Sequence, residues 1–166
     1  MLSHAERADL IAQYAAGHAA VMEALAGITD DEWEAREAPG EWSPRQVAHH
    51  LADSEMASAL RLRQMLVSDQ AEIVPYDQDE YARVLFYDRP VEASLAAFAA
   101  ARAATVPILE RMTDEQWART AHHSEEPAYS TELWLRYYAR HAHDHADQIR
   151  RARATVREKQ GKQVTV

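Results

Sequence analysis

Histidine is the residue type in this sequence that most clearly indicates metal binding or catalysis. Nine of the 166 residues are histidine and none is cysteine, which excludes disulfides, thiolate ligands and a cysteine nucleophile. Neutral imidazole is the commonest side-chain ligand of zinc and related metals. The histidines that fall into groups are His49-His50, His122-His123, and the series His141, His143 and His145.

His141 and His145 are four residues apart in a segment that we predict to be helical. This spacing places both rings on one helix face, one turn apart, where they can share a metal ion. The other members of the same stripe are apolar or aromatic, namely Trp134, Tyr138 and Ile149. We therefore expect both rings to point inward, whereas His143 lies roughly opposite and should be solvated.

Two imidazoles rarely suffice for a metal, and the zinc-protease pattern does not apply. That pattern needs glutamate directly after the first histidine, and position 142 is alanine. A third ligand must come from another helix. His50 lies beside the apolar stripe of the second predicted helix, and His49 is turned about 100° away from it. Helix periodicity alone does not choose between the two.

Four long helical segments position these residues. The first runs from about residue 3 to 27, with Ser3 as N-cap and Glu6 completing a capping box. The second begins at Ser43, has Pro44 in its first turn and continues to about residue 68. The third follows residues 89–90, extends to about residue 112 and contains Pro107, which should kink it. The fourth starts near residue 130 and passes Ile149 into a charged tail that should be frayed from about residue 156.

The connections between these segments are long. Residues 28–42 join the first two helices, and residues 70–90 cross from the second to the third, with a short helix expected at 77–85. ITDDEW (28–33) is echoed by MTDEQW (112–117), and each precedes a capped helix that carries histidine. This echo predicts two helical hairpins of similar construction. We expect residues 1–166 to form a single all-α domain.

The charge of the chain limits its partners. The formal net charge is −9, so we expect no binding to nucleic acid or to anionic membrane. The N-terminus does not resemble a signal peptide, and no uninterrupted apolar stretch approaches the length of a membrane span. A cytoplasmic protein is the expectation.

The histidine segments resemble two motifs of one family. PGEWSPRQVAHHLADSE (39–55) is similar to the helix-two motif of the DinB/YfiT-like superfamily, and YARHAHDHADQIR (138–150) is similar to its last-helix motif. The resemblance implies an up-down-down-up four-helix bundle with a long crossover connection, which is often a homodimer. It also implies one divalent ion, zinc or nickel, with His50, His141 and His145 as ligands.

Three imidazoles leave coordination positions open, which is typical of catalytic metal sites. Relatives implied by the resemblance include transferases that use thiols such as bacillithiol or mycothiol, and metal-dependent hydrolases. We favour transfer of a low-molecular-weight thiol to a small electrophile, because the sequence shows no positioned general base. The alternatives are a metal-dependent hydrolase and a non-enzymatic, metal-stabilised binding protein.

The sequence does not decide the roles of several other residues near the predicted site. Asp53 follows His50 by one turn and can orient a ligand imidazole. His18 is expected to be a core histidine, and His122 and His123 surface residues. Either Trp134 or Tyr138 is a candidate pocket residue. Three arginines are candidates for binding a substrate carboxylate if they face inward, namely Arg61, Arg102 and Arg136.

Overall fold

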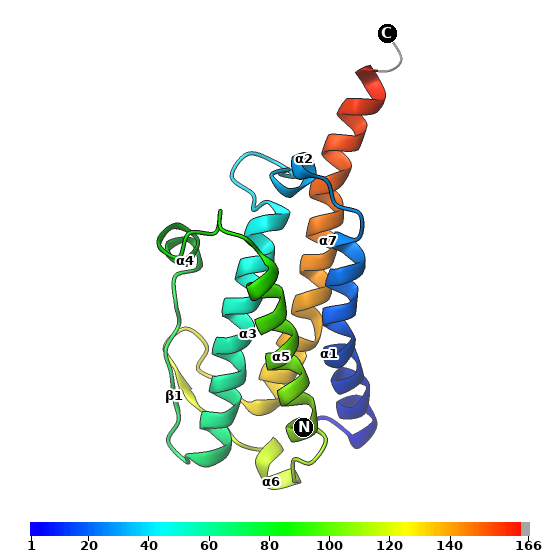
Figure 1. Ribbon diagram of the computed structural model, residues 1–166. Helices are drawn as coiled ribbons and strands as arrows, with labels where there is room; N and C mark the ends of the chain where they lie inside the picture. Colours follow the sequence, from blue (N-terminus) through cyan, green and yellow to red (C-terminus); the bar gives the residue numbers. More distant parts are fainter. Residues whose placement is uncertain (164–166) are drawn as a thin grey trace.

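The structure is a computed structural model that describes the backbone of residues 1–163 and the side chains of residues 1–159. Its four long helices are α1 (His4–Leu25), α3 (Pro44–Val67), α5 (Glu92–Leu109) and α7 (Thr131–Gln163). Figure 1 shows that α1 and α7 run in one direction and α3 and α5 in the other. The predicted all-α bundle with up-down-down-up order is therefore confirmed.

Short elements occupy the connections. The one-turn helices α2 (Asp30–Trp33) and α6 (Asp114–Trp117) follow α1 and α5, and α4 (Gln78–Val84) lies in the long crossing. The crossing runs along the length of the bundle, because α5 is parallel to α3 and must start at the same end (Figure 1). Strand β1 (Glu72–Ile73) in this crossing pairs in parallel with β2 (His122–His123), which fastens the crossing to the loop before α7.

The helix starts are confirmed in detail. Ser3 and Ser43 cap α1 and α3, and each belongs to a capping box. The echoed hexapeptides form α2 and α6, which have equivalent capping boxes from Thr29 and Thr113. The side-chain oxygen of each cap accepts a backbone N–H that has no partner inside the helix.

The third and fourth helices differ from the expectation at their ends. α5 ends at Leu109, so Pro107 lies in its last turn and Met112 lies beyond the helix. α7 remains helical to Gln163, so most of the segment predicted as a frayed tail is helical, and residues 164–166 lie outside the described part of the chain. α5 is also long and apolar enough to span a membrane by length and composition, contrary to the expectation. In the structure it packs in the bundle and buries Arg102.

Arg102 of α5 contacts all three other long helices. Its Nε donates to Glu55 Oε2 of α3 over 2.8 Å, and its Nη2 donates to the carbonyl of Tyr138 in α7 over 3.0 Å. Its Nη1 donates to the carbonyl of Tyr14 in α1, and the Tyr14 hydroxyl donates to Glu55. The arginine and glutamate side chains are 2% and 1% exposed. Arg102 is therefore engaged in the core, which corrects its assignment as a candidate for binding substrate.

Gly17 allows α1 to approach this pair. A Cβ atom at position 17 would overlap Arg102 Nη1 and would lie 2.7 Å from the Cβ of Ala142 on α7. Only glycine leaves the room that the guanidinium occupies.

We expect Arg102→Met to lower the free energy of unfolding by about 3–5 kcal/mol, because it leaves the Glu55 carboxylate buried without its partner. Urea unfolding followed by circular dichroism measures the loss. The double variant Arg102→Met/Glu55→Met should be more stable than Arg102→Met alone. A single variant within about 1 kcal/mol of wild type would contradict this role for the pair.

We expect Gly17→Ala to destabilise the protein by about 1–3 kcal/mol through overpacking. At an exposed helix position the same change would stabilise by up to about 1 kcal/mol. Ala16→Gly on the exposed face of α1 is the matched control and should cost no more than about 1 kcal/mol in the same unfolding experiment. Stabilisation by Gly17→Ala would contradict the close approach of α1 to Arg102 and Ala142.

Candidate metal centre

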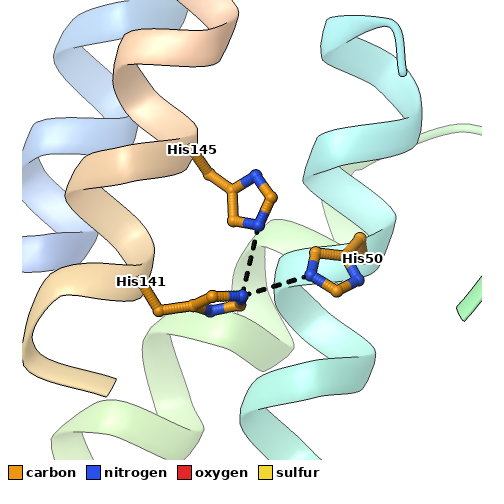
Figure 2. A group of neighbouring side chains, drawn as sticks. All are labelled: His50, His141 and His145. Atoms are coloured by element: carbon orange, nitrogen blue, oxygen red, sulfur yellow. Dashed lines mark hydrogen bonds between the residues drawn. The ribbon is translucent and has the colours of Figure 1, made fainter. Parts of the chain in front are cut away.

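Three histidines converge between α3 and α7. Figure 2 shows His50 of α3 facing His141 and His145 of α7, with the Nε2 atoms directed toward one another. The Nε2 atom of His141 lies 3.3 Å from that of His50 and 3.2 Å from that of His145. One nitrogen from each ring lies within 4.8 Å of the other two. The structure thus brings together the three residues selected from the sequence.

The spacing of these nitrogens fits a shared metal ion. Two imidazole nitrogens bound to zinc at about 2.1 Å with a near-tetrahedral angle are about 3.4 Å apart. The separations of 3.2 and 3.3 Å are close to that value. An ion shared by all three rings also requires the ligand nitrogens of His50 and His145, which lie within 4.8 Å of each other, to take up a similar separation.

The three rings are held in the neutral form that metal binding requires. Burial lowers the pKa of His50 to about 3, and the nearby His145 adds to the effect. Burial, followed by the two neighbouring rings, lowers the pKa of His141 well below its ordinary value. Burial also lowers the pKa of His145, although Gln148 and Asp144 oppose the shift.

A hydrogen bond fixes the tautomer of His145. Its Nδ1 lies 2.8 Å from Oε1 of Gln148, one turn later on α7. The amide oxygen only accepts, so Nδ1 carries the ring proton and the Nε2 lone pair faces the other two histidines. Gln148 therefore prepares His145 as an Nε2 ligand.

His50 is oriented by packing instead. The ring of Trp42 meets it edge to face, with centroids 4.6 Å apart. Its Nδ1 is buried without a hydrogen-bond partner among the described residues. The expected role of Asp53 is wrong in this structure, because Asp53 Oδ2 accepts from the Tyr87 hydroxyl over 2.7 Å and makes no bond to His50.

His49 lies outside the cluster and faces α5. Its Nε2 donates to the carbonyl of Arg89 over 3.0 Å, which leaves Nδ1 to accept from the Ser94 hydroxyl at 2.8 Å. Both ring nitrogens are used, and the side chain is fully buried. His49 is thus a hydrogen-bonded core histidine.

The remaining histidines differ in part from the expectation. His18 is half-buried on α1 and lies outside the cluster. His143, expected to be solvated, is half-buried, and its Nε2 donates to the carbonyl of Gln13 over 3.0 Å. His122 is exposed as expected, whereas His123 is buried.

A pocket of about 350 Å³ lies close to His141, and none of the three histidines is among its lining residues. Tyr137 and Tyr138 line it and also contact His141, with ring centroids 5.3 and 5.7 Å away. Tyr138 is thus the pocket residue of the two candidates. Trp134 is fully buried, and its Nε1 donates to the backbone carbonyl of Ser58. Of the three candidate arginines only Arg61 lines this pocket.

Sequence reasoning missed several residues of the pocket. Tyr76 comes from the long crossing, and His123 and Tyr129 come from the loop before α7. These segments have no periodicity, and the β1–β2 pairing that joins them links residues about 50 positions apart. The unusual length of the crossing was the only signal.

We expect the metal-free protein to lose stability as the pH falls below about 6.5. The unfolded chain then takes up protons on its histidines, whereas burial lowers the pKa of the three histidines in the folded state and keeps them neutral to a lower pH. At pH 5.5 His50, whose folded-state pKa is about 3, should cost about 1 kcal/mol relative to pH 7.5, and the lowered pKa values of His141 and His145 act in the same direction. Urea unfolding with chelator at both pH values measures the difference.

The matched variant for this measurement is His50→Gln/His141→Gln/His145→Gln. Its stability should depend on pH less strongly than that of wild type, by at least about 1 kcal/mol over the same interval. Equal pH dependence in the two proteins would contradict neutral buried imidazoles.

Comparisons with known proteins agree with this architecture. The family model described as the DinB superfamily matches residues 13–149. A protein of Oceanobacillus iheyensis, named provisionally as a metal-dependent hydrolase, is 34% identical over 110 residues, which are 66% of this chain and 64% of that protein. The chain thus spans slightly less than two thirds of this relative.

YfiT of Bacillus subtilis, also named provisionally as a metal-dependent hydrolase, is 30% identical over 133 residues, which cover 79% of this chain and 75% of that protein. The solved structure of YfiT, described as an unusual four-helix bundle, superposes with a TM-score of 0.84 at 27% identity. The superposition covers 90% of this chain and 86% of YfiT.

Proposed function

The chain belongs to the DinB superfamily, and on that premise we propose that it is a metal-dependent enzyme with one divalent ion held by His50, His141 and His145. The observation that carries the proposal is the convergence of three imidazole Nε2 atoms at metal-ligand spacing. The names of the relatives, which describe dependence on metal, support it. Neutral imidazoles suit zinc and nickel, the two metals we expect.

The donor set favours a catalytic rather than a structural ion. A structural zinc site has four protein ligands, and among the described residues the group contains only the three histidines. An ion bound there would act as a Lewis acid and lower the pKa of a water or thiol on its open side. Trp42 and Tyr137 pack against His50 and His141 and form part of the aromatic surroundings of the site.

The preferred reaction is transfer of a low-molecular-weight thiol to a small electrophile. The carboxylates near the histidines are already engaged: Asp53 by Tyr87, Glu55 by Arg102, and the exposed Asp144 by Arg140. A thiol loses its proton more easily than water does and therefore depends less on a general base. In this reaction a carbon–sulfur bond forms, the bond to the leaving group breaks, and the thiol proton passes to solvent.

The second candidate is hydrolysis, which is favoured by the provisional names of the relatives. The third is a binding protein that the metal only stabilises. Homodimer formation, a cytoplasmic location and the absence of nucleic-acid or membrane partners stay predictions from the sequence.

We expect metal analysis to find one divalent ion per chain in wild type and none in His141→Ala/His145→Ala. His50→Ala should lose most of the ion, because it removes one of three ligands. His122→Ala, which changes an exposed histidine, is the control and should retain full occupancy. His49→Ala should also retain the ion in its folded fraction. Full occupancy in the double variant would refute the ligand assignment.

We expect Gln148→Leu to weaken metal binding by about 10- to 100-fold, because it removes the acceptor that fixes the His145 tautomer. Gln148→Glu should retain the affinity, since a carboxylate accepts the same proton. Asp147→Asn, an exposed neighbour, is the matched control. Competition with a chromophoric chelator measures all three, and an unchanged affinity in Gln148→Leu would show that the tautomer is set otherwise.

The reaction is tested with metal-loaded and metal-free protein. Conjugation of monochlorobimane with bacillithiol, mycothiol or glutathione should be accelerated only by the loaded protein and lost in His145→Ala. If no thiol is conjugated but a panel of esters and amides is cleaved in a metal-dependent way, the hydrolase assignment replaces the transferase. If both panels are negative, the protein is a metal-stabilised binding protein.

A further inference from the structure

The pocket beside the histidines is built from four separate segments. Arg61 comes from α3, Tyr76 from the long crossing, His123 and Tyr129 from the loop before α7, and Tyr137 from α7 itself. Its volume of about 350 Å³ is at the lower end of the range for small-molecule sites, about 300–1,000 Å³. Four tyrosine rings, those of residues 76, 129, 137 and 138, give it an aromatic wall.

Tyr129 supplies a buried donor that is not used within the protein. The residue is 9% exposed, and its hydroxyl has no hydrogen-bond partner among the described residues. Burial raises the pKa of this hydroxyl to about 12, against the opposing charge of Arg61. The hydroxyl therefore keeps its proton at neutral pH, and it can donate to a ligand once the groups that cover the oxygen move aside. A buried polar group without a partner is costly and calls for an explanation.

His123 presents a second donor. Its Nδ1 accepts the backbone N–H groups of Glu125 and Glu126, each over 3.1 Å. The ring proton must therefore reside on Nε2. The residue is 8% exposed, and its ring stacks on Tyr129 with centroids 5.0 Å apart and an interplanar angle of 24°. The stacking holds the imidazole against the face of the Tyr129 ring.

Arg61 adds a positive charge. Its Nη2 donates to the carbonyl of Val74 over 2.6 Å, and its guanidinium lies over the Tyr76 ring at 5.7 Å from the centroid. Among the described side chains it has no carboxylate within ion-pair distance, whereas the buried arginines Arg7, Arg102 and Arg153 are all paired. The guanidinium is thus fixed in place with its charge uncompensated.

Two carboxylates also line the pocket and bear on the charge of its ligand. Glu125 and Glu126 are exposed, whereas Arg61 is half-buried and the Tyr129 and His123 side chains are buried. The carboxylates therefore lie at the solvent end, where water and salt screen them. The donors lie at the inner end, where their interactions are stronger.

We propose that this pocket binds a small aromatic carboxylate, with the carboxylate held by Arg61, Tyr129 and His123 and the ring packed among the tyrosines. The charge-assisted bonds select an anion, and the aromatic wall selects a planar apolar group. The inference rests on the proposed function only in that such a ligand would be a substrate of the adjacent metal centre. Binding itself requires no metal.

The test uses chelator-treated full-length protein and three probes of similar size: phenylacetate, phenylacetamide and benzylamine. Phenylacetate should bind at least about fivefold more tightly than the neutral amide and about tenfold more tightly than the amine. Chemical-shift titration measures the affinities. If benzylamine binds most tightly, Glu125 and Glu126 govern the pocket and the proposal is overturned; absence of phenylacetate binding overturns it as well.

Variants locate the bound carboxylate. Arg61→Gln should weaken the binding of phenylacetate by about tenfold. Tyr129→Phe, which removes only the hydroxyl, should weaken it by about fivefold. Arg136→Gln changes an exposed arginine outside the pocket and should leave the affinity within about twofold of wild type. Equal affinities in Arg61→Gln, Tyr129→Phe and wild type would overturn the proposed carboxylate site.

Metal titration of the same proteins separates this inference from the proposed function. Arg61→Gln and Tyr129→Phe should still bind one ion, because neither is a ligand. If wild type binds phenylacetate but no divalent ion, the proposed function fails and the aromatic-carboxylate site stands. If it binds the ion but not phenylacetate, the site proposed in this pocket fails alone.

Discussion

The buried pair of Arg102 and Glu55 is the interaction on which the position of the histidines depends. One guanidinium bonds to groups on α1, α3 and α7 at once, so it sets how these helices lie against α5. Its bond to the Tyr138 carbonyl is made one turn before Ala142, the neighbour of His141. A buried ion pair adds little net stability by itself, because desolvation offsets its attraction. Its specific geometry favours one arrangement of the four helices over alternatives that leave the charges unmatched.

The order of the helices explains why the metal centre and the pocket are neighbours. In an up-down-down-up bundle α3 and α5 are parallel, so the chain between them must travel the length of the domain (Figure 1). That crossing passes beside the loop before α7 and pairs with it through β1 and β2. The pairing brings Tyr76 and Tyr129 together next to α7. The topology that places His50 opposite His141 thus also produces a wall for the adjacent cavity.

The sequence predicted what depends on local spacing and failed where distant segments meet. Capping boxes located the helix starts, and the four-residue spacing of His141 and His145 placed both rings on one face. Periodicity could not separate His49 from His50, since α3 packs against both α5 and α7 and buries both rings fully or nearly so. The motif resemblance singled out His50, and it is the ring that faces α7. The partner of Arg102 was not predictable, because an arginine in an alanine-rich helix gives no sign of a carboxylate 47 residues earlier.

The distribution of charge sets limits on any ligand of the interior. The formal net charge is −9, and two exposed carboxylates, Glu125 and Glu126, stand at the solvent end of the pocket. The inner groups of the pocket and the metal centre are imidazoles, tyrosines and the cationic Arg61. An anion is repelled at long range by the acidic surface and attracted only within hydrogen-bond distance of the inner donors. Salt at about 0.1 M screens charges beyond about 10 Å and weakens the repulsion more than the buried contacts. Selection of an anionic ligand in this protein must therefore come from the geometry of a few fixed donors and not from electrostatic steering.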